Sequence, residues 1–408
     1  MKDGLETFRR QVGERGEPGA VVVGLNPAGL GVVRALGRRG TPVLGVSSNF
    51  ADPASHTRFC GKVSCPDIDG PPLLDTLLSI SQRFDRPPVL FLSGDLCVRL
   101  VSHHREELQS RYRFLLPAKD KVELLLDKGL FTAYALENHL PIPATFRASD
   151  VAGVRRVAAV VDYPCIVKPV FRNQRWEKTP TPKAFTASSR DQLLAVYDRI
   201  VGLQKDVVIQ EWIPGPDSEI YFCLVYFDGS GTPLVHFEGR KLFQWVPACG
   251  STAIAEPVAC DAVQAESLRF LQAIGFKGMG SVEFKRDPRD GRFKIMEPTV
   301  GRPNLQSDTA TACGINIPCI VYDDLAGVPA AGRDGRKVRD RKWIYEENAF
   351  DLIRYRTHYG VTFSAIMQSV KGNRCYALLA RDDPGPFLKF LTNVFRRAIK
   401  RLGTRGAA

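Results

Sequence analysis

The sequence predicts an α/β domain with a parallel sheet, followed by a larger α+β domain. The first observation is a βαβ unit: apolar strands over residues 20–24 and 42–47 flank a helix over 32–39, as in parallel sheets. The second is that strands and helices after residue 119 occur in runs that favour antiparallel pairing. The third is that no segment reaches the ~20 consecutive apolar residues needed to span a bilayer.

Composition is that of an ordinary globular protein of 408 residues, with 44% hydrophobic and 25% charged residues. The net charge of +12 implies affinity for an anion, and nucleotides, anionic lipids and nucleic acids all qualify. Residues 1–10 are charged and lack an apolar core, so we expect no secretory signal. The ten cysteines show no C-x-x-C pair, which favours free thiols in a reducing cytoplasm.

The first 118 residues contain the elements of the α/β domain. Residues 1–18 predict a mobile, weakly structured lead, and residues 19–118 the domain itself. Helical periodicity over 73–82 and a buried apolar strand over 88–93 continue the alternation. We therefore place the end of this domain near residue 118.

A glycine-rich turn follows the first strand and invites comparison with dinucleotide-binding turns. Its spacing, with Gly24, Gly29 and Gly31, is not G-x-G-x-x-G, and Pro27 interrupts the usual turn. NAD or FAD binding and a purely structural turn remain as alternatives, and the spacing favours the structural turn.

The region from residue 119 to residue 330 predicts a second domain. A helix over 121–138 is followed by a strand over 163–170, a basic loop over 171–182 and a strand over 207–213. Antiparallel strands, a further helix and a final hairpin complete the region.

That final hairpin, over residues 281–304, carries two glutamates. Apolar residues alternate with polar ones on both sides of the turn at 287–291, and we expect Glu283 to face Glu297 and Lys285 to face Ile295. Like charges opposite each other destabilise a sheet unless a cation lies between them.

Two carboxylates on one face are hard oxygen ligands that suit Mg²⁺ shared with nucleotide phosphates, with Arg302 and Asn304 nearby. The alternative is a solvated hairpin edge that happens to carry Glu283 and Glu297.

Taken together, the charged residues resemble the pattern of the ATP-grasp superfamily over roughly residues 20–325. The matching positions, in chain order, are Asp127-Lys128, Lys168-Pro169, Gln210-Glu-Trp-Ile213, Glu219, Arg240-Lys241, Glu283 and Glu297. The resemblance implies a Rossmann-like pre-ATP-grasp domain followed by a two-lobed ATP-grasp domain.

The resemblance also implies an ATP site. Lys128 and Lys168 would bind the α- and β-phosphates, because lysine presents a compact point charge. Residues 171–183 correspond to a mobile loop that closes over the phosphates, with Lys183 at its end. The other implied ATP-binding residues are Glu211, Trp212 and Ile213, along the adenine, and Glu219, at the ribose.

Glu283 and Glu297 would hold Mg²⁺, with two ions implied and Mn²⁺ as an alternative. The family's ending is Glu-x-Asn-x-Arg, whereas Glu297 is followed here by Thr299 and later by Arg302 and Asn304. Either Thr299 or Asn304 would supply the third oxygen.

Arg302, Arg240 and Lys241 are the candidate catalytic residues. The Arg302 guanidinium suits an acyl-phosphate and the oxyanion that follows it. The alternative for Arg240 and Lys241 is that they are simply a pair of surface residues on an edge strand. The segment from Glu297 to Arg302 is also similar to a subgroup of ATP-grasp ligases close to amino-acid and D-aspartate ligases.

The implied activity is a carboxylate–amine ligase that forms an acyl-phosphate from ATP and joins small carboxylate and amine substrates. The alternatives are an ATP-grasp kinase or carboxylase and, in another class, a non-catalytic nucleotide- or anion-binding protein. We expect no nucleic-acid partner, because aromatic residues do not interleave with the basic runs.

Residues 331–408 form a C-terminal extension. A charged connector over 331–342 leads to residues 342–345, which we expect to return to the core. Residues 387–402 have one apolar helical face and several basic residues. Two alternatives follow: a helix that packs on the domain, or peripheral contact with the inner face of a membrane. The sequence does not indicate an oligomeric state.

Overall fold

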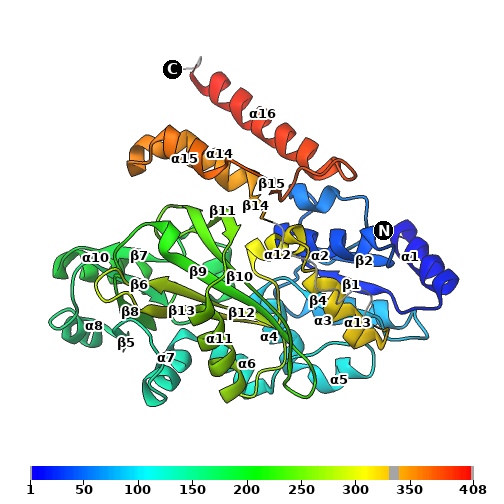
Figure 1. Cartoon of the computed structure of the whole chain (residues 1–408), viewed down its shortest axis with the longest axis horizontal. Helices are drawn as coiled ribbons and strands as arrows, with labels where there is room; N and C mark the ends of the chain where they lie inside the picture. The colour runs from blue at the N-terminus through cyan, green and yellow to red at the C-terminus, as the bar shows by residue number, and fades with distance from the viewer. Residues whose placement is uncertain (1, 330–339, 406–408) are drawn as a thin grey trace.

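The N-terminal sheet is parallel, as predicted (Figure 1). The computed structural model describes residues 2–329 and 340–405. The strands have the order β3-β2-β1-β4, and all residues of β1, β2 and β4 are buried, which explains their continuous apolar runs. The elements are β1 (Ala20–Val23), α2 (Pro27–Arg38), β2 (Val43–Ser47), η1 (Pro53–His56), β3 (Gly61–Ser64), α3 (Pro72–Ser81), β4 (Val89–Leu92), α4 (Asp95–His103) and α5 (Arg105–Gln109).

The expectation of a weakly structured lead over residues 1–18 is wrong for α1 (Lys2–Arg15). Phe8 of this helix is buried in the core, and Leu5 and Val12 pack against the same cluster. These three apolar residues recur at helical spacing and form one stripe, which is the periodicity that the sequence analysis overlooked.

The glycine turn after β1 is closed by its own groups. The Asn26 side chain accepts a hydrogen bond from Gly29 N (3.0 Å) and donates one to Ser93 Oγ (3.1 Å). A Cβ at Gly29 would lie 1.9 Å from Gly24 O, so only glycine fits this close approach. These contacts support the structural-turn alternative.

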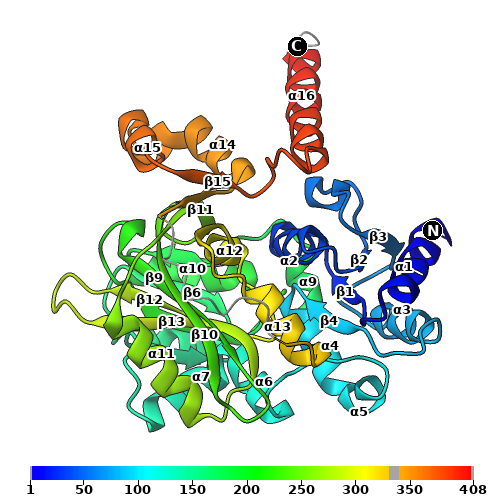
Figure 2. The ribbon, with the colours of Figure 1, turned by 45° about the vertical axis from the view of Figure 1, so that its right-hand side comes forward.

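Two further sheets follow, and they are antiparallel except for the β14–β15 pair, so the predicted α+β character is confirmed. The smaller sheet has the order β5-β8-β6-β7, and the larger has the order β13-β12-β9-β10-β11-β14-β15. Figure 2 shows both on the side of the molecule opposite α1.

The elements of the smaller sheet and its surroundings are α6 (Lys119–Leu126), α7 (Lys128–Glu137), β5 (Thr145–Ala148), α8 (Val151–Val157), β6 (Cys165–Pro169), α9 (Gln174–Glu177), β7 (Phe185–Ala187), α10 (Arg190–Ile200) and β8 (Val207–Glu211). Those of the larger sheet and its surroundings are η2 (Asp217–Glu219), β9 (Ile220–Phe227), β10 (Pro233–Trp245), β11 (Ser251–Pro257), α11 (Asp261–Ala273), β12 (Gly278–Arg286), β13 (Phe293–Val300), η3 (Leu305–Ser307), α12 (Asp308–Cys313) and α13 (Ile317–Ala326).

The single helix predicted over 121–138 is broken at Asp127. This residue is extended, and its carboxylate accepts a hydrogen bond from Leu130 N (2.9 Å), so it caps the N-terminus of α7. Lys128 is therefore the first residue of a new helix, and its backbone N–H donates to the carbonyl oxygen of Val170, the residue that follows the strand carrying Lys168.

The hairpin of β12 and β13 pairs Glu283 with Glu297, as predicted. The predicted pairing of Lys285 with Ile295 is wrong, because Phe284 pairs with Ile295 and Lys285 with Lys294. The register shift leaves Met296 as an extra residue in β13, which is the geometry of a β-bulge.

The C-terminal segment extends the larger sheet and then leaves it. Its elements are β14 (Lys342–Ile344), α14 (Glu346–Tyr355), η4 (Arg356–Tyr359), α15 (Phe363–Ser369), β15 (Arg374–Tyr376) and α16 (Gly385–Arg405). Trp343 is fully buried, so the predicted return of residues 342–345 to the core is confirmed. The charged connector predicted over 331–342 lies mostly outside the described residues.

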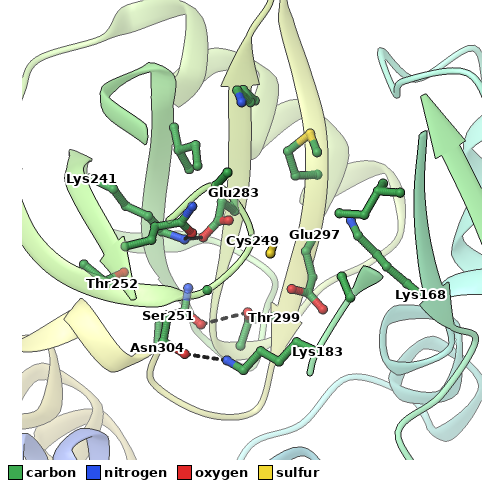
Figure 3. A pocket seen from close by; sticks show the side chains of 18 of the residues that line it. Lys168, Lys183, Lys241, Cys249, Ser251, Thr252, Glu283, Glu297, Thr299 and Asn304 are labelled. Carbon is green, nitrogen blue, oxygen red and sulfur yellow. Dashed lines mark hydrogen bonds and ion pairs between the residues drawn. The ribbon is translucent and has the colours of Figure 1, made fainter. Parts of the chain in front are cut away.

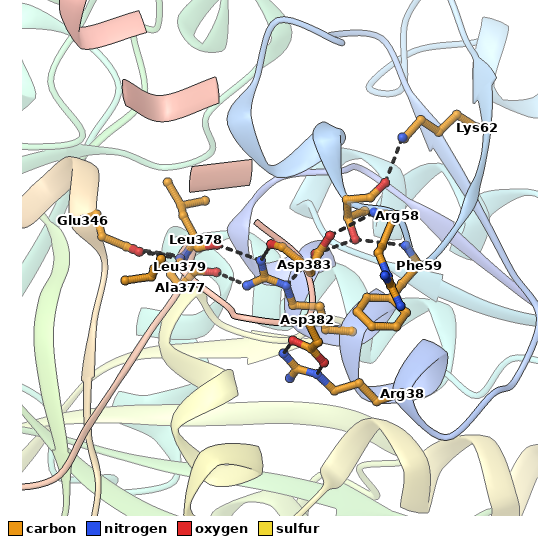
Figure 4. Close-up of polar contacts among 12 residues, drawn as sticks. Arg38, Arg58, Phe59, Lys62, Glu346, Ala377, Leu378, Leu379, Asp382 and Asp383 are labelled. Carbon is orange, nitrogen blue, oxygen red and sulfur yellow. Dashed lines mark hydrogen bonds and ion pairs between the residues drawn. The ribbon is translucent and has the colours of Figure 1, made fainter. Parts of the chain in front are cut away.

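A buried ion pair fastens this segment to the parallel domain (Figure 4). Arg34 Nε donates to Asp383 Oδ2 (2.8 Å), and the two side chains are 3% and 1% exposed. The Arg34 guanidinium also donates to the carbonyl oxygens of Ala377 and Leu378, at 2.6 and 2.7 Å. Both strand β15 and the start of α16 are thereby held at helix α2.

We predict that Arg34→Ala lowers the free energy of unfolding by ~3–5 kcal/mol, because it leaves the buried Asp383 carboxylate without its cation. Arg38→Ala is a matched control, since Arg38 lies one turn later and forms a 2.8 Å pair with Asp382 that is largely exposed. This control should lose no more than ~1 kcal/mol. Denaturant unfolding measures both, and equal small losses would contradict the assignment.

Candidate functional site

A pocket of about 220 Å³ brings together side chains from the smaller sheet and the β12–β13 hairpin. Figure 3 shows several lysines and both hairpin glutamates directed into it. The predicted site residues that line the pocket are Lys128, Lys168, Lys183, Glu211, Trp212, Ile213, Lys241, Glu283, Glu297, Thr299, Arg302 and Asn304. Two predicted residues, Arg240 and Glu219, are not among its lining residues.

Each hairpin carboxylate has a lysine beside it. Lys241 Nζ lies 2.7 Å from Glu283 Oε2, and Lys128 Nζ lies 2.8 Å from Glu297 Oε1. Desolvation would raise the pKa of Glu297, but the Lys128 and Lys168 ammonium groups hold that pKa well below its ordinary value. Glu297 is therefore a carboxylate at neutral pH, and the repulsion expected across the hairpin is offset by cations.

Two neutral oxygens lie next to these carboxylates. Thr299 Oγ1 donates to Asn304 Oδ1 (2.9 Å), and Asn304 Nδ2 donates to Ser281 Oγ (2.6 Å). Within residues 2–329 and 340–405, no cluster of three or more His, Cys, Asp or Glu residues could hold a metal. The donor set of two carboxylates with neutral oxygens nevertheless fits Mg²⁺, which takes one or two carboxylates together with substrate phosphates.

Arg302 is oriented by the parallel domain. Its Nε donates to Asp95 Oδ1, at the first residue of α4, and Arg172 Nη2 lies 3.9 Å from the other Asp95 oxygen. Desolvation would raise the pKa of Asp95, but the Arg302 charge lowers it. The sequence analysis did not assign Asp95, because nothing local indicates a partner 207 residues away.

Two lysines have lowered pKa values at this pocket. Lys168 Nζ donates to Gln210 Oε1 (3.0 Å), and removal from water lowers the pKa of Lys168. Lys183 Nζ donates to Ser251 Oγ (2.6 Å). Partial removal from water and the nearby Arg172 charge lower the pKa of Lys183 to about 8.

The loop over residues 171–183 reaches across to the parallel domain. Gln174 Nε2 donates to Asp67 Oδ2 (2.6 Å), and Lys178 Nζ lies 3.2 Å from the same oxygen. Asp67 follows strand β3, so these contacts join the loop to the domain on the far side of the pocket.

The opposite end of the pocket is less charged. Trp212 and Ile213 follow strand β8, and together with Glu211 they line the pocket. Lys285, which the sequence analysis did not assign, places Nζ 5.2 Å from the Trp212 ring centroid and donates to Gly215 O (3.1 Å). An aromatic face beside a cation suits a flat heteroaromatic ring.

Glu219 lies outside the lining of the pocket but has an unusual oxygen. Its Oε2 is buried and has no hydrogen-bond partner in the part of the chain that the structure describes. An unsatisfied buried oxygen is costly, and a donor that reached it on ligand binding would remove that cost.

Arg240, predicted to be a catalytic residue, does not line the pocket. Its guanidinium bonds Glu256 at 2.7 Å on the neighbouring strand, whereas the next residue, Lys241, lines the pocket. Successive side chains of a strand alternate between faces, so only one of the two can enter. The prediction of a pocket role for Arg240 is corrected accordingly.

Two further residues, Asp217 and Gln306, complete the site. The Asp217 carboxylate accepts hydrogen bonds from Gln244 N (2.8 Å) and Ala248 N (2.9 Å), which holds the β10–β11 connection against the pocket. Gln306 accepts a bond from Thr252 Oγ1 (3.1 Å), and its Nε2 is buried without a partner among the described residues. Gln306 lines the pocket, so this amide can donate to a bound molecule.

No family model matches the chain. It is 26% identical over 295 residues to a D-aspartate ligase of Enterococcus faecium (strain Aus0004), covering 67% of this chain and 69% of the relative.

Among solved structures, an ADP complex of PurK, an N5-carboxyaminoimidazole ribonucleotide synthetase, has a TM-score of 0.63 at 12% identity, covering 84% of this chain and 86% of that one. A biotin carboxylase from Campylobacter jejuni has a TM-score of 0.61 at 15% identity, covering 78% and 73%. At such identities the structures establish the fold.

The predicted fold class, a parallel-sheet domain followed by the ATP-grasp lobes, is confirmed by these neighbours and by the sheet orders. The chain thus has the ATP-grasp fold and is similar in sequence to a D-aspartate ligase.

Proposed function

We propose that the protein is an ATP- and Mg²⁺-dependent ligase that joins a small carboxylate to an amine. The observation that carries this proposal is the opposed pair Glu283 and Glu297, each beside a lysine, in one pocket with the segment Glu211–Ile213. The similarity to a D-aspartate ligase over two thirds of both chains supports the same chemistry.

In this proposal ATP lies along the length of the pocket. The adenine contacts Trp212 and Ile213, and the unsatisfied Glu219 oxygen accepts from a ribose hydroxyl. Lys168 and Lys128 bind the α- and β-phosphates, and Lys183 approaches from the end of its loop. The lowered pKa of Lys168 follows from its removal from water, and a bound phosphate would favour its charged form.

The metal end of the site uses Glu283 and Glu297, with Thr299 or Asn304 as the further oxygen, and we propose two Mg²⁺ ions there. When bound, the ions neutralise charge on the phosphates. Lys128 and Lys241 pair with the same carboxylates and hold them in place.

The reaction proceeds in two steps. A carboxylate oxygen of the first substrate attacks the γ-phosphorus of ATP, and the bond to the bridging oxygen breaks, which gives an acyl-phosphate and ADP. The amine then attacks the acyl carbon, phosphate leaves with the bonding electron pair, and the nitrogen loses a proton to form the amide. Arg302, held by Asp95, stabilises negative charge on the acyl-phosphate and the tetrahedral species.

We propose that Gln244, Ser251, Thr252 and Gln306 contact the substrates, because they line the same pocket as Arg302. The Gln306 amide, which lacks a partner among the described residues, is suited to a substrate carboxylate or carbonyl. We propose an amino acid as one substrate, because it carries the groups that this chemistry joins and because the similar protein is named a D-aspartate ligase.

We further propose that two metal ions bind, with Mn²⁺ as an alternative to Mg²⁺, and that residues 387–402 give the protein a peripheral location at a membrane. We also propose domain boundaries near residues 118 and 330.

We predict that Glu297→Gln weakens Mg-ATP binding by at least roughly tenfold, because a charged oxygen ligand is lost. Isothermal titration with and without Mg²⁺ measures this. Glu256→Gln is the control, since Glu256 pairs with Arg240 outside the pocket and should leave the affinity unchanged. A wild-type chain that does not bind Mg-ATP would contradict the proposal.

A second prediction concerns pH. Lys183 has a pKa of about 8, so its ammonium form dominates below that pH and is lost above it. ATP affinity should therefore be highest below about pH 8 and fall as the pH rises through this value. Lys183→Arg should flatten this fall because arginine stays protonated. Identical pH profiles for the two proteins would rule out a phosphate contact by Lys183.

A third prediction separates the two arginines. With ADP and phosphate release measured over a panel of amino acids and amines, Arg302→Ala should lower kcat by roughly a hundredfold or more. Arg240→Ala should change kcat little, because its guanidinium pairs with Glu256 instead. Equal losses of kcat in the two arginine variants would contradict the assignment of Arg302.

Adding bicarbonate to the same assay tests the carboxylase alternative. Phosphate release that needs bicarbonate and no other carboxylate would favour that alternative.

A further inference from the structure

Helix α16 extends away from the rest of the molecule (Figure 2). Its first turns pack on the body: Phe390 is buried, and its ring centroid lies 6.3 Å from that of Phe350 in α14. From Phe395 to Ile399, by contrast, every residue is exposed. This includes Ala398, which is on the packed side of the helix.

The outer surface of α16 carries an unpartnered apolar stripe. Leu388, Phe395 and Ile399 are 57%, 66% and 68% exposed. At about 100° per residue, positions seven and eleven residues after Leu388 fall within about 20° of it, so the three side chains share one face. Large aliphatic and aromatic residues this exposed on a single face indicate a surface that is covered by a partner.

The same helix is basic and has no acidic residue. The sequence from Gly385 to Arg405 contains lysine or arginine at positions 389, 396, 397, 400, 401 and 405, and neither aspartate nor glutamate. Lys389 and Arg396 lie about 80–100° around the helix from the apolar stripe. An apolar face bordered by cations complements a surface that is anionic outside and apolar beneath.

The root of α16 is fixed. Asp383, two residues before the helix, accepts from Arg34, from Thr57 Oγ1 (2.7 Å) and from Arg58 N (3.0 Å). A Cβ at Gly385 would lie 2.3 Å from His56 O, so the first residue of the helix packs directly on η1. The helix is therefore presented in a set direction by the parallel domain.

We propose that α16 docks the protein on an anionic lipid bilayer, with Leu388, Phe395 and Ile399 inserted below the headgroups and the basic side chains at the phosphate level. None of the described helices is long and apolar enough to cross a membrane, so the contact is peripheral. The proposal goes beyond the ligase function and does not depend on it.

A second copy of this chain is a poorer occupant of the stripe. Pairing of two α16 helices would bring the basic residues of one chain toward those of the other, and each chain carries a net charge of +12. Anionic lipid supplies the complementary charge that a second copy lacks.

The test is co-sedimentation of the full chain with phosphatidylcholine vesicles, with and without 30% phosphatidylglycerol. We expect binding to the anionic vesicles that decreases as salt is added, and a loss of roughly tenfold or more in the triple variant Leu388→Ser, Phe395→Ser, Ile399→Ser. Arg396→Glu with Arg397→Glu should abolish the dependence on anionic lipid.

The matched control is Leu136→Ser with Val160→Ser, since these side chains are 57% and 66% exposed but lie far from α16 in the sequence. This control should bind vesicles as the wild type does, and an unchanged melting temperature shows that each variant is folded. No binding by the wild type, or equal binding by the triple variant, would overturn the proposal. So would a wild-type dimer that the triple variant converts to a monomer, which would make a second copy the occupant.

Discussion

The repulsion between Glu283 and Glu297 is the constraint on which the site depends. Backbone pairing places the two carboxylates opposite each other, where like charges destabilise the sheet. The chain resolves this with cations from outside the hairpin, since Lys241 comes from β10 and Lys128 from the start of α7. The site therefore places positive charge beside both carboxylates.

That arrangement joins three parts of the fold. The break at Asp127 places Lys128 at a helix start, and the backbone bond from Lys128 N to Val170 O ties it to the strand of Lys168. Asp95 of the parallel domain fixes Arg302, and Asp67 of the same domain holds the loop before Lys183. The parallel domain thus serves the site by orienting residues of the other lobes.

Much of the site was predictable because its residues occur in strands and turns with strong local patterns. The alternation of Phe284 and Ile295 with charged residues was enough to predict the pairing of Glu283 with Glu297. The bulge at Met296 was not predictable, because a single extra residue leaves the alternation of each strand nearly unchanged. Arg240 was misplaced since either of two adjacent basic residues could have faced inward.

The missed residues, Asp95 and Asp217, act through tertiary partners far along the chain. Their local sequences indicate only a helix start and a turn, and no single-sequence pattern specifies what they contact.

The most direct test of the central claim, that this pocket activates a carboxylate through an acyl-phosphate, follows oxygen-18 from the carboxylate of a turned-over substrate. The account predicts that each molecule of amide formed transfers one labelled oxygen to the released phosphate, seen by mass spectrometry. Phosphate free of label, with amide formed, would contradict it.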